Sequence, residues 1–126
     1  KEPTADEIQK MVRATMADFT EAMERDDFEI VRKKTSKSFQ QQYSANQIKD
    51  SFSYFYAKKN LSIPLFQEVQ KISAEFTMPN KMREADKNYF LETKGKFSVK
   101  TLELNFHFEY IREDGKWKLN KFQIKT

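Results

Sequence analysis

The residues that could carry out chemistry in this chain are few and scattered. His107 is the only histidine and there is no cysteine, which excludes a thiol nucleophile, a thiolate metal site and a disulfide. What remains is acid–base chemistry of the isomerase or cyclase type, which needs a carboxylate or histidine base facing an acid or a tyrosine. The candidates for those roles are Asp18, Glu21, Asp26, Asp27, Asp50 and Glu92, together with Tyr43, Tyr54, Tyr56, Tyr89 and Tyr110.

No pair among these candidates has a spacing that indicates a catalytic site. The acids fall on polar faces or helix caps, and none is clearly surrounded by apolar neighbours, where a perturbed pKa is expected. His107 has the same parity as Glu103 and Glu109 and the opposite parity to Phe106 and Phe108, so we expect it to point away from the interior. We therefore assign no catalytic residue.

Metal and nucleotide sites have no motif either. No Asp-x-Asp-x-Asp-Gly series is present for calcium, and one histidine without cysteine leaves only carboxylates as further ligands. Gly95 and Gly115 stand alone, so no glycine-rich phosphate loop is indicated. We expect neither a metal nor a cofactor.

The strongest structural pattern lies near the C-terminus. Apolar residues occupy every second position from Leu102 to Tyr110, which predicts a strand with one buried face. Asp114-Gly115 follows and separates this run from a second one, which predicts a hairpin closed by a type I′ turn. In that register Tyr110 lies opposite Leu119.

The returning strand changes its apolar parity part-way. Trp117 and Leu119 are at odd positions, whereas Phe122 and Ile124 are at even ones. One extra residue between Leu119 and Phe122 would return all four to a single face. We therefore predict a β-bulge there, which bends the strand and increases its twist. We also expect Trp117→Ala to be among the costliest substitutions if the indole is buried, at about 3 kcal/mol or more.

Three helices are expected upstream of the strands. The capping box Thr4–Glu7 and an apolar stripe at three- and four-residue steps predict a first helix from about Ala5 to about Glu24. A thinner stripe from Phe28 to Phe39 predicts a second helix. A further capping box at Ser44–Gln47 predicts a third, from about Ala45 to about Lys58, with Asn60 as its stop.

After Pro64 the pattern becomes extended. Alternation predicts a strand from about Phe66 to about Met78, and the charged segment Lys81–Lys87 is expected to be a loop. The next strand begins near Tyr89.

Two positions are open for the turn that closes this strand. It falls either at Gly95 or at Ser98–Lys100. The later turn is slightly favoured because it keeps Phe97 in phase with Tyr89 and Leu91, and Glu92 would face inward only with the earlier turn.

Length and composition favour one domain spanning residues 1–126, with an aromatic core that draws on 12 phenylalanines. No apolar run approaches the roughly 18 residues needed to cross a membrane. The chain starts at Lys1 without a methionine, so we expect a processed mature protein or a trimmed chain, and export is a further hypothesis.

Charge is mixed, with 23 Lys and Arg against 19 Asp and Glu, a net charge of +4. A basic stripe on the last strand could contact phosphates, and it consists of Lys116, Lys118, Lys121 and Lys125. Because Glu103, Glu109 and Glu113 lie on the outer face of the neighbouring strand, we expect these lysines to form solvated cross-strand pairs. Nucleic-acid binding is therefore not expected.

The predicted order is α+β, with three N-terminal helices followed by a meander of about four antiparallel strands. This layout, the break at Asp26-Asp27-Phe28 and the final hairpin Glu113–Leu119 resemble the nuclear transport factor 2-like, cystatin-like superfamily, especially small bacterial domains of unknown function within it. The resemblance implies a cone-shaped roll, in which a curved sheet wraps around the helices and leaves a cavity.

The superfamily contains isomerase-like and cyclase-like enzymes as well as non-catalytic binding domains, often dimeric, so fold alone does not decide the function. Its catalytic dyads find no matching positions in this sequence. We expect a non-catalytic domain that binds a small apolar ligand or a protein, and the alternative is an isomerase- or cyclase-type enzyme. A homodimer through the outer sheet face is a further hypothesis, based on Ile111. The residues expected to line the cavity are Met16, Phe19, Phe52, Tyr56, Phe76, Tyr89, Phe106, Phe108, Tyr110 and Trp117.

Overall fold

The computed structural model describes residues 2–126, and the fold is α+β. The helices are α1 (Ala5–Arg25), α2 (Glu29–Arg32), α3 (Lys37–Gln42), α4 (Ala45–Ser51), α5 (Ser53–Tyr56) and α6 (Lys59–Val69). The strands are β1 (Glu75–Phe76), β2 (Lys81–Ala85), β3 (Asn88–Val99), β4 (Leu102–Glu113) and β5 (Lys116–Lys125). Among the described residues, six helices thus precede a five-stranded antiparallel sheet.

The long first helix begins and ends where its capping residues predict. The Thr4 hydroxyl accepts a hydrogen bond from the Glu7 backbone N–H at 3.1 Å, and the Glu7 carboxylate accepts one from the Thr4 N–H at 2.7 Å. Asp26 has a φ of 52°, a left-handed conformation that ends α1 at Arg25. The predicted first helix is confirmed to within one residue.

The predicted second helix is instead two short helices, α2 and α3. Between them Thr35 forms a parallel β-bridge with Leu119. The Ser36 N–H donates to the Leu119 carbonyl at 2.9 Å, and the Leu119 N–H donates to the Lys34 carbonyl at 3.3 Å. Ser36 then caps α3 by accepting a bond from the Phe39 N–H. Backbone pairing with β5 therefore interrupts the helix that the apolar stripe predicted.

The predicted third helix is also interrupted. Its capping box is present, because the Ser44 hydroxyl accepts from the Gln47 N–H and the Gln47 side chain accepts from the Ser44 N–H. Phe52, with φ −103° and ψ 10°, separates α4 from α5. Asn60, which was predicted to end this helix, lies inside the next helix, α6.

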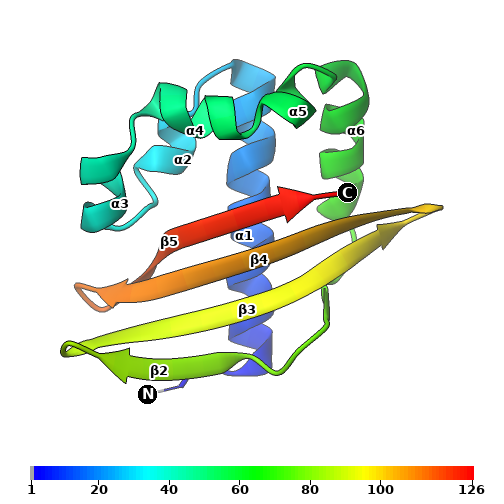
Figure 1. The fold of residues 1–126 in the computed structure, drawn as a ribbon. Helices are drawn as coiled ribbons and strands as arrows, with labels where there is room; N and C mark the ends of the chain where they lie inside the picture. Colours follow the sequence, from blue (N-terminus) through cyan, green and yellow to red (C-terminus); the bar gives the residue numbers. More distant parts are fainter. Residues whose placement is uncertain (1) are drawn as a thin grey trace.

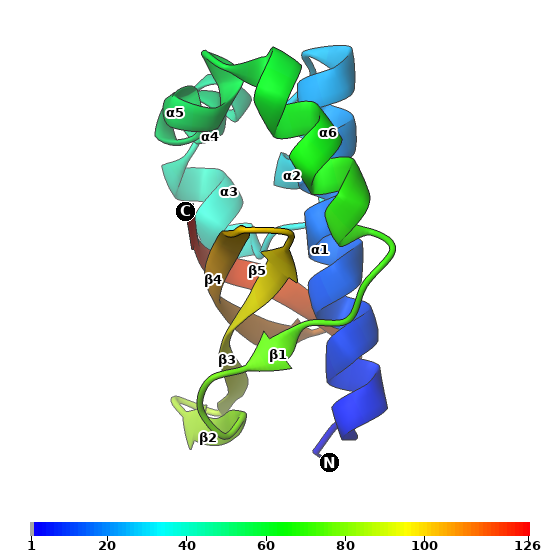
Figure 2. The same cartoon turned by 90° about the vertical axis from the view of Figure 1, so that its right-hand side faces the viewer.

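Helix α6 replaces part of the strand that was predicted for Phe66–Met78, and only β1 is extended there. Its buried residues Ser62, Phe66 and Val69 recur at four- and three-residue steps, and α6 packs against α1. Pro64 inside the helix costs about 3 kcal/mol in isolation, so packing outweighs this cost. Figure 2 shows α6 lying alongside α1.

The sheet has the order β1-β3-β4-β5, and β2 also pairs with β3. β1 pairs with β3 at Lys96 and Gly95, and β2 pairs with the same edge of β3 from Glu92 to Asn88. Among the described residues the sheet thus has five strands, one more than the four or so predicted, and two of them share one edge of β3.

The prediction of a loop at Lys81–Lys87 is wrong. Most of it is β2, and Asp86 and Lys87, with φ of 52° and 67°, form the turn into β3. Both central residues adopt the positive φ that a type I′ hairpin turn requires, although neither is glycine.

The turn between β3 and β4 is the later of the two predicted. β3 continues through Gly95 to Val99, and Lys100 has the positive φ of the turn, 56°. Gly95 pairs with Phe106 without a bulge. A Cβ atom at Gly95 would collide with the Glu75 carbonyl and lie 2.8 Å from Cζ of Phe106, so glycine permits the close approach of β1.

The C-terminal hairpin has the predicted turn, register and bulge. Asp114 and Gly115 have φ of 51° and 75°, and Tyr110 pairs with Leu119. The register shifts by one between that pair and the pair of Glu109 with Lys121, which leaves Asn120 as the extra residue.

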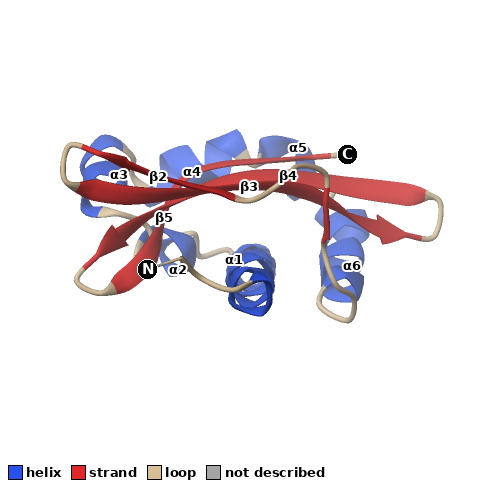
Figure 3. Cartoon of the chain, turned by 90° about the horizontal axis from the view of Figure 1, so that it is seen from below, coloured by secondary structure: helices blue, strands red, loops and turns tan. Residues whose placement is uncertain are grey.

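The helices cover one face of the sheet and extend past one of its edges. α1 runs behind the strands, and α3, α4 and α5 lie beyond the edge formed by β5 (Figure 1). Figure 3 shows α1 and α6 on the same side of the sheet. The core lies between α1 and the inner sheet face, where the side chains exposed by 2% or less include Met16, Phe19, Phe97, Phe106 and Phe108.

Candidate binding groove

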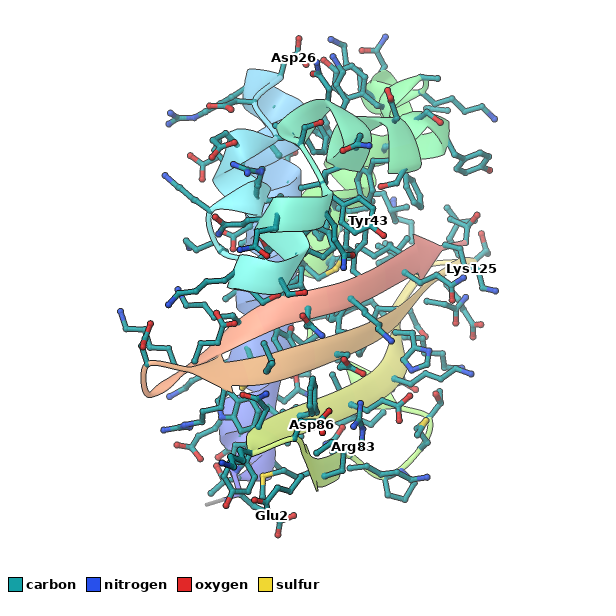
Figure 4. The ribbon with its side chains drawn as sticks, turned by 60° about the vertical axis from the view of Figure 1, so that its left-hand side comes forward. Glu2, Asp26, Tyr43, Arg83, Asp86 and Lys125 are labelled. Carbon is teal, nitrogen blue, oxygen red and sulfur yellow. The ribbon has the colours of Figure 1, made fainter. Side chains whose placement is uncertain are left out.

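A groove of about 580 Å³ opens between β5 and the helices α3 and α4. Its apolar lining consists of Phe39, Tyr43, Ile48, Phe52, Phe122 and Ile124. Figure 4 shows Tyr43 above β5 on the side of these helices, and Lys125 at the C-terminal end of the strand. The volume falls within the roughly 300–1,000 Å³ of ligand sites.

Aromatic rings connect the floor of the groove to the core. The ring centroids of Phe39 and Phe122 are 6.0 Å apart, and Phe122 lies 5.0 Å from Phe19 of α1. Tyr43 packs against Phe39 at 4.7 Å, yet its side chain is 42% exposed. The groove therefore offers a fixed aromatic floor and a tyrosine ring open to solvent.

Hydroxyl and amide groups provide the polar lining, and they belong to Ser38, Gln42, Gln47, Ser51, Asn120 and Gln123. The Asn120 side chain is held in place, because Oδ1 accepts from the Ser36 hydroxyl at 2.6 Å and Nδ2 donates to Glu109 at 2.9 Å. Among residues 2–126, Lys121 is the only charged residue in the lining. With no carboxylate or imidazole, the lining can hold an apolar molecule and hydrogen-bond to it, but it provides no strong general base.

Local sequence features create this groove. The extra residue Asn120 returns Phe122 and Ile124 to the inner face of the sheet, which an uninterrupted strand would turn outward. Ser36 and Ser44 start the two helices that form the opposite wall.

The residues predicted to line a cavity are not gathered at one site. Met16, Phe19, Phe106 and Phe108 are buried in the core, each 2% exposed or less. Phe52 is the only member of the predicted set that lines the groove, and its ring stacks on Phe19 with centroids 4.7 Å apart.

The other five predicted residues are spread around the molecule. Tyr110 and Trp117 line a second pocket near the C-terminal hairpin. Tyr56 and Phe76 are half-buried and pack at the margin of the core. Tyr89 is 40% exposed, because its position next to the β2–β3 turn leaves it outside the core.

Most of the groove residues were not predicted as site residues. Phe39, Ile48, Phe122 and Ile124 have the spacing of core positions in helices and strands, and nothing local shows that they face a common opening. The parity change on β5 was the usable signal, because it places Phe122 and Ile124 on the inner face next to the edge. Tyr43, four residues after Phe39, follows the helical stripe but belongs to the end of α3.

The second pocket, of about 370 Å³, lies between α1 and the end of the C-terminal hairpin. Asp18 and Tyr110 both line it. Burial raises the pKa of Asp18, although Lys34 Nζ lies 3.5 Å from its carboxylate. Burial also raises the pKa of Tyr110, whose hydroxyl is hydrogen-bonded to that of Thr15 at 2.7 Å. The tyrosine is therefore a neutral group, and Thr15 already engages it.

The outer sheet face carries His107, as predicted. Its Nε2 lies 2.6 Å from Oε2 of Glu92, and both side chains are 39% exposed. Glu92 thus points outward, in agreement with the later turn. Ile111, the basis of the dimer hypothesis, is only 8% exposed between Phe90 and Lys118 in the register, so it offers little apolar surface to a second copy.

Among the described residues, no ion pair joins a lysine of β5 to a glutamate of β4, although such pairs were expected. Glu103 pairs with Lys96 at 2.8 Å, and Glu109 pairs with Arg83 at 3.3 Å. Within residues 2–126, Lys121 and Lys125 have no carboxylate within 4.0 Å, because the acids on β4 contact side chains of β2 and β3 instead.

No model of a known protein family matches the chain, and no curated protein matches it. In the part of the chain that the structure describes, no three acidic, histidine or cysteine side chains form a metal-binding group. No helix in residues 2–126 is both long and apolar enough to cross a membrane.

Proposed function

We propose that this chain is a non-catalytic binding domain and that its site is the groove between β5, α3 and α4. The observation that carries the proposal is the lining, which has six apolar side chains, neutral amides and hydroxyls, and neither carboxylate nor imidazole. Such a site recognises apolar surface and fixes its orientation by hydrogen bonds. An apolar lining with neutral hydrogen-bonding groups is typical of domains that bind proteins or small ligands.

The size of the apolar floor sets the class of ligand. Burial of about 100 Å² of apolar surface contributes roughly 2.5 kcal/mol. One aromatic ring or two aliphatic side chains placed against Phe39 and Phe122 would bury about that much. We therefore propose a ligand that presents an aromatic or branched aliphatic group to the floor.

We also propose membership of the nuclear transport factor 2-like superfamily, with its cone-shaped roll. The long α1, the helices before the strands and the bulge at Asn120 support it. In a cone the binding site would lie between sheet and helices, and the proposed groove is formed by elements of both kinds.

The test uses 2-naphthol as an apolar probe and follows amide chemical shifts by NMR. Ser51→Trp, which fills the groove, is expected to weaken binding by about tenfold or more. Ser53→Trp is the matched control, because Ser53 is also exposed but does not line the groove. Shift changes confined to residues outside the groove, or equal binding by the two variants, would contradict the proposal.

The second candidate function, an isomerase- or cyclase-type enzyme, is favoured by one observation. Asp18, with its raised pKa, shares a pocket with the hydroxyl-bearing Tyr110. In this role Asp18 would remove a proton next to a carbonyl group. Deuterium incorporation from D2O into cyclohexanone, lost in Asp18→Asn, would support it, whereas a rate equal to the buffer rate would exclude this chemistry for that class of ketone.

A further inference from the structure

The outer edge of β5 presents free backbone groups to the groove. At Leu119 both the N–H and the carbonyl point away from β4, because they bond to Lys34 and Ser36. Tyr110 lies opposite Leu119, so its backbone N–H and carbonyl must point to β3. Backbone direction alternates along a strand, so the N–H and carbonyl groups of Glu109 and His107 point to β5. Their partners Lys121 and Gln123 thus face β4.

Phe122 and Ile124, which alternate with these partners, therefore direct their N–H and carbonyl groups outward. An independent bond agrees with this parity. The Lys94 carbonyl accepts from Thr77 and so points away from β4, which requires its partner His107 to face β5. Four backbone groups, two donors and two acceptors, are thus aligned along this edge.

The groove runs along the same edge. Its lining includes every residue from 120 to 124, although Phe122 and Ile124 lie on the opposite sheet face to Lys121 and Gln123. A pocket on one face of a strand would be lined by alternate residues only. The groove is therefore wide enough to expose the backbone edge of β5 as well as its apolar side chains.

Another segment of the same chain already pairs with the outer edge of β5 at Leu119. The segment around Thr35 pairs with Leu119, then turns away at Ser36 into α3. An edge that accepts one added segment at Leu119 has the geometry to accept another at Phe122 and Ile124.

The positive charge next to this edge favours an added strand that carries acidic side chains. Lys121 and Lys125 lie beside the free edge without a carboxylate partner among residues 2–126. A second copy of β5 paired antiparallel would bring these lysines close to their own equivalents, which repel. Acidic side chains would instead find a partner there.

We propose that the groove binds an extended peptide segment with alternating acidic and apolar residues, which adds to β5 as an antiparallel strand. The apolar residues would lie against Phe39 and Phe122, and the acidic residues would face Lys121 and Lys125. The backbone groups of the apolar residues would bond to those of Phe122 and Ile124. This inference rests on the proposed function and names its ligand class.

The probe is an acetylated, amidated peptide of four Glu-Val repeats. It is expected to slow hydrogen exchange at the Phe122 and Ile124 amides and to shift the signals of Tyr43 and Ile48. Residues opposite each other in an antiparallel pair share a face, so valines that face the groove floor lie opposite Phe122 and Ile124. The backbone groups of Phe122 and Ile124 point toward the peptide, so it is the valines that form the backbone bonds. N-methylation of every valine should therefore weaken binding by about tenfold or more, and N-methylation of every glutamate should change it little.

A matched pair of variants separates the edge from the side chains. Ile124→Ala removes the side chain and keeps the N–H, whereas Ile124→Pro removes both, and proline is tolerated where an edge N–H faces outward. We expect Ile124→Pro to bind about tenfold more weakly than Ile124→Ala. Equal affinities, or shifts in the groove without slower exchange at the two amides, would overturn the edge pairing and leave the groove proposal standing.

Two further outcomes would also overturn this inference. A peptide of Lys-Val repeats that binds as tightly as the Glu-Val peptide at about 50 mM salt would remove the acidic selection. A dodecathymidylate probe that binds along β5 while the Glu-Val peptide does not would assign the lysines to a nucleic acid. The 2-naphthol result is independent of both, so failure of the peptide alone leaves the proposed function intact.

Discussion

The hydroxyl of Ser36 donates a hydrogen bond to Oδ1 of Asn120 at 2.6 Å, which joins the cap of α3 to the bulge of β5. The Ser36 hydroxyl oxygen also accepts a hydrogen bond from the Phe39 N–H at 3.1 Å. Ser36 is fully buried and Phe39 is 8% exposed, so water reaches the Phe39 N–H poorly when the hydroxyl is removed. One side chain thus fixes the two walls of the groove relative to each other.

Ser36→Ala should therefore cost more than an ordinary helix cap. We expect a loss of about 2 kcal/mol in the free energy of unfolding, because the buried Phe39 N–H and the half-buried Asn120 side chain both lose a partner. Ser44→Ala is the control, since Ser44 caps α4 from an exposed position and should cost about 1 kcal/mol. Urea denaturation measures both, and equal losses would show that the Asn120 contact adds no stability.

The close approach of β1 to β3 predicts an unusual cost for Gly95→Ala. The added methyl group would meet the Glu75 backbone and the Phe106 ring, so the loss should reach about 3 kcal/mol. Gly115→Ala meets no atom within 4 Å and should cost only about 1–2 kcal/mol, from its φ of 75°. Denaturation midpoints that rank the two variants in the opposite order would show that β1 moves away freely.

The features predicted correctly from the sequence are those that depend on local chemistry. The capping boxes at Thr4 and Ser44 set helix starts through bonds within three residues. The turn at Asp114-Gly115 fixed the hairpin register, and the parity change located the bulge at Asn120. The parity of β4 also placed His107 outside.

The features that were missed depend on partners distant in the sequence. Thr35 leaves the helical pattern because Leu119 offers it a strand edge, and no residue near Thr35 indicates that edge. α6 forms across Pro64 because α1 covers its buried face. The turn at Asp86-Lys87 lacks glycine, so β2 was predicted to be a loop. The groove was missed for the same reason, since residues from α3, α4 and β5 meet there only in the folded chain.

Trp117 is half-buried at the margin of the core, and the Arg112 guanidinium lies 5.5 Å from its ring. Trp117→Ala should then cost about 1–2 kcal/mol, less than the 3 kcal/mol expected for a buried indole. Phe108→Ala, at a fully buried position on β4, should cost about 3–5 kcal/mol. A larger loss for Trp117→Ala than for Phe108→Ala in urea denaturation would contradict this placement.

The burial of Asp18 predicts a pH dependence of stability. Because its pKa is raised above 3.8 in the folded state, chiefly by burial, the folded chain holds this proton more tightly than the unfolded chain. Ionisation of Asp18 therefore opposes folding. As the pH rises from below 3.8 through the raised folded-state pKa, the wild-type chain should lose stability relative to Asp18→Asn, which does not titrate.

Asp26 provides a control with the opposite sign. A hydrogen bond from Lys49 at 2.8 Å lowers the pKa of Asp26, so its ionised form favours the folded state. As the pH rises through this lowered pKa towards 3.8, the wild-type chain should gain stability relative to Asp26→Asn. Urea denaturation between about pH 2 and pH 7 gives both difference curves. A gain in wild-type stability with pH relative to Asp18→Asn would show that Lys34, rather than burial, controls the Asp18 carboxylate.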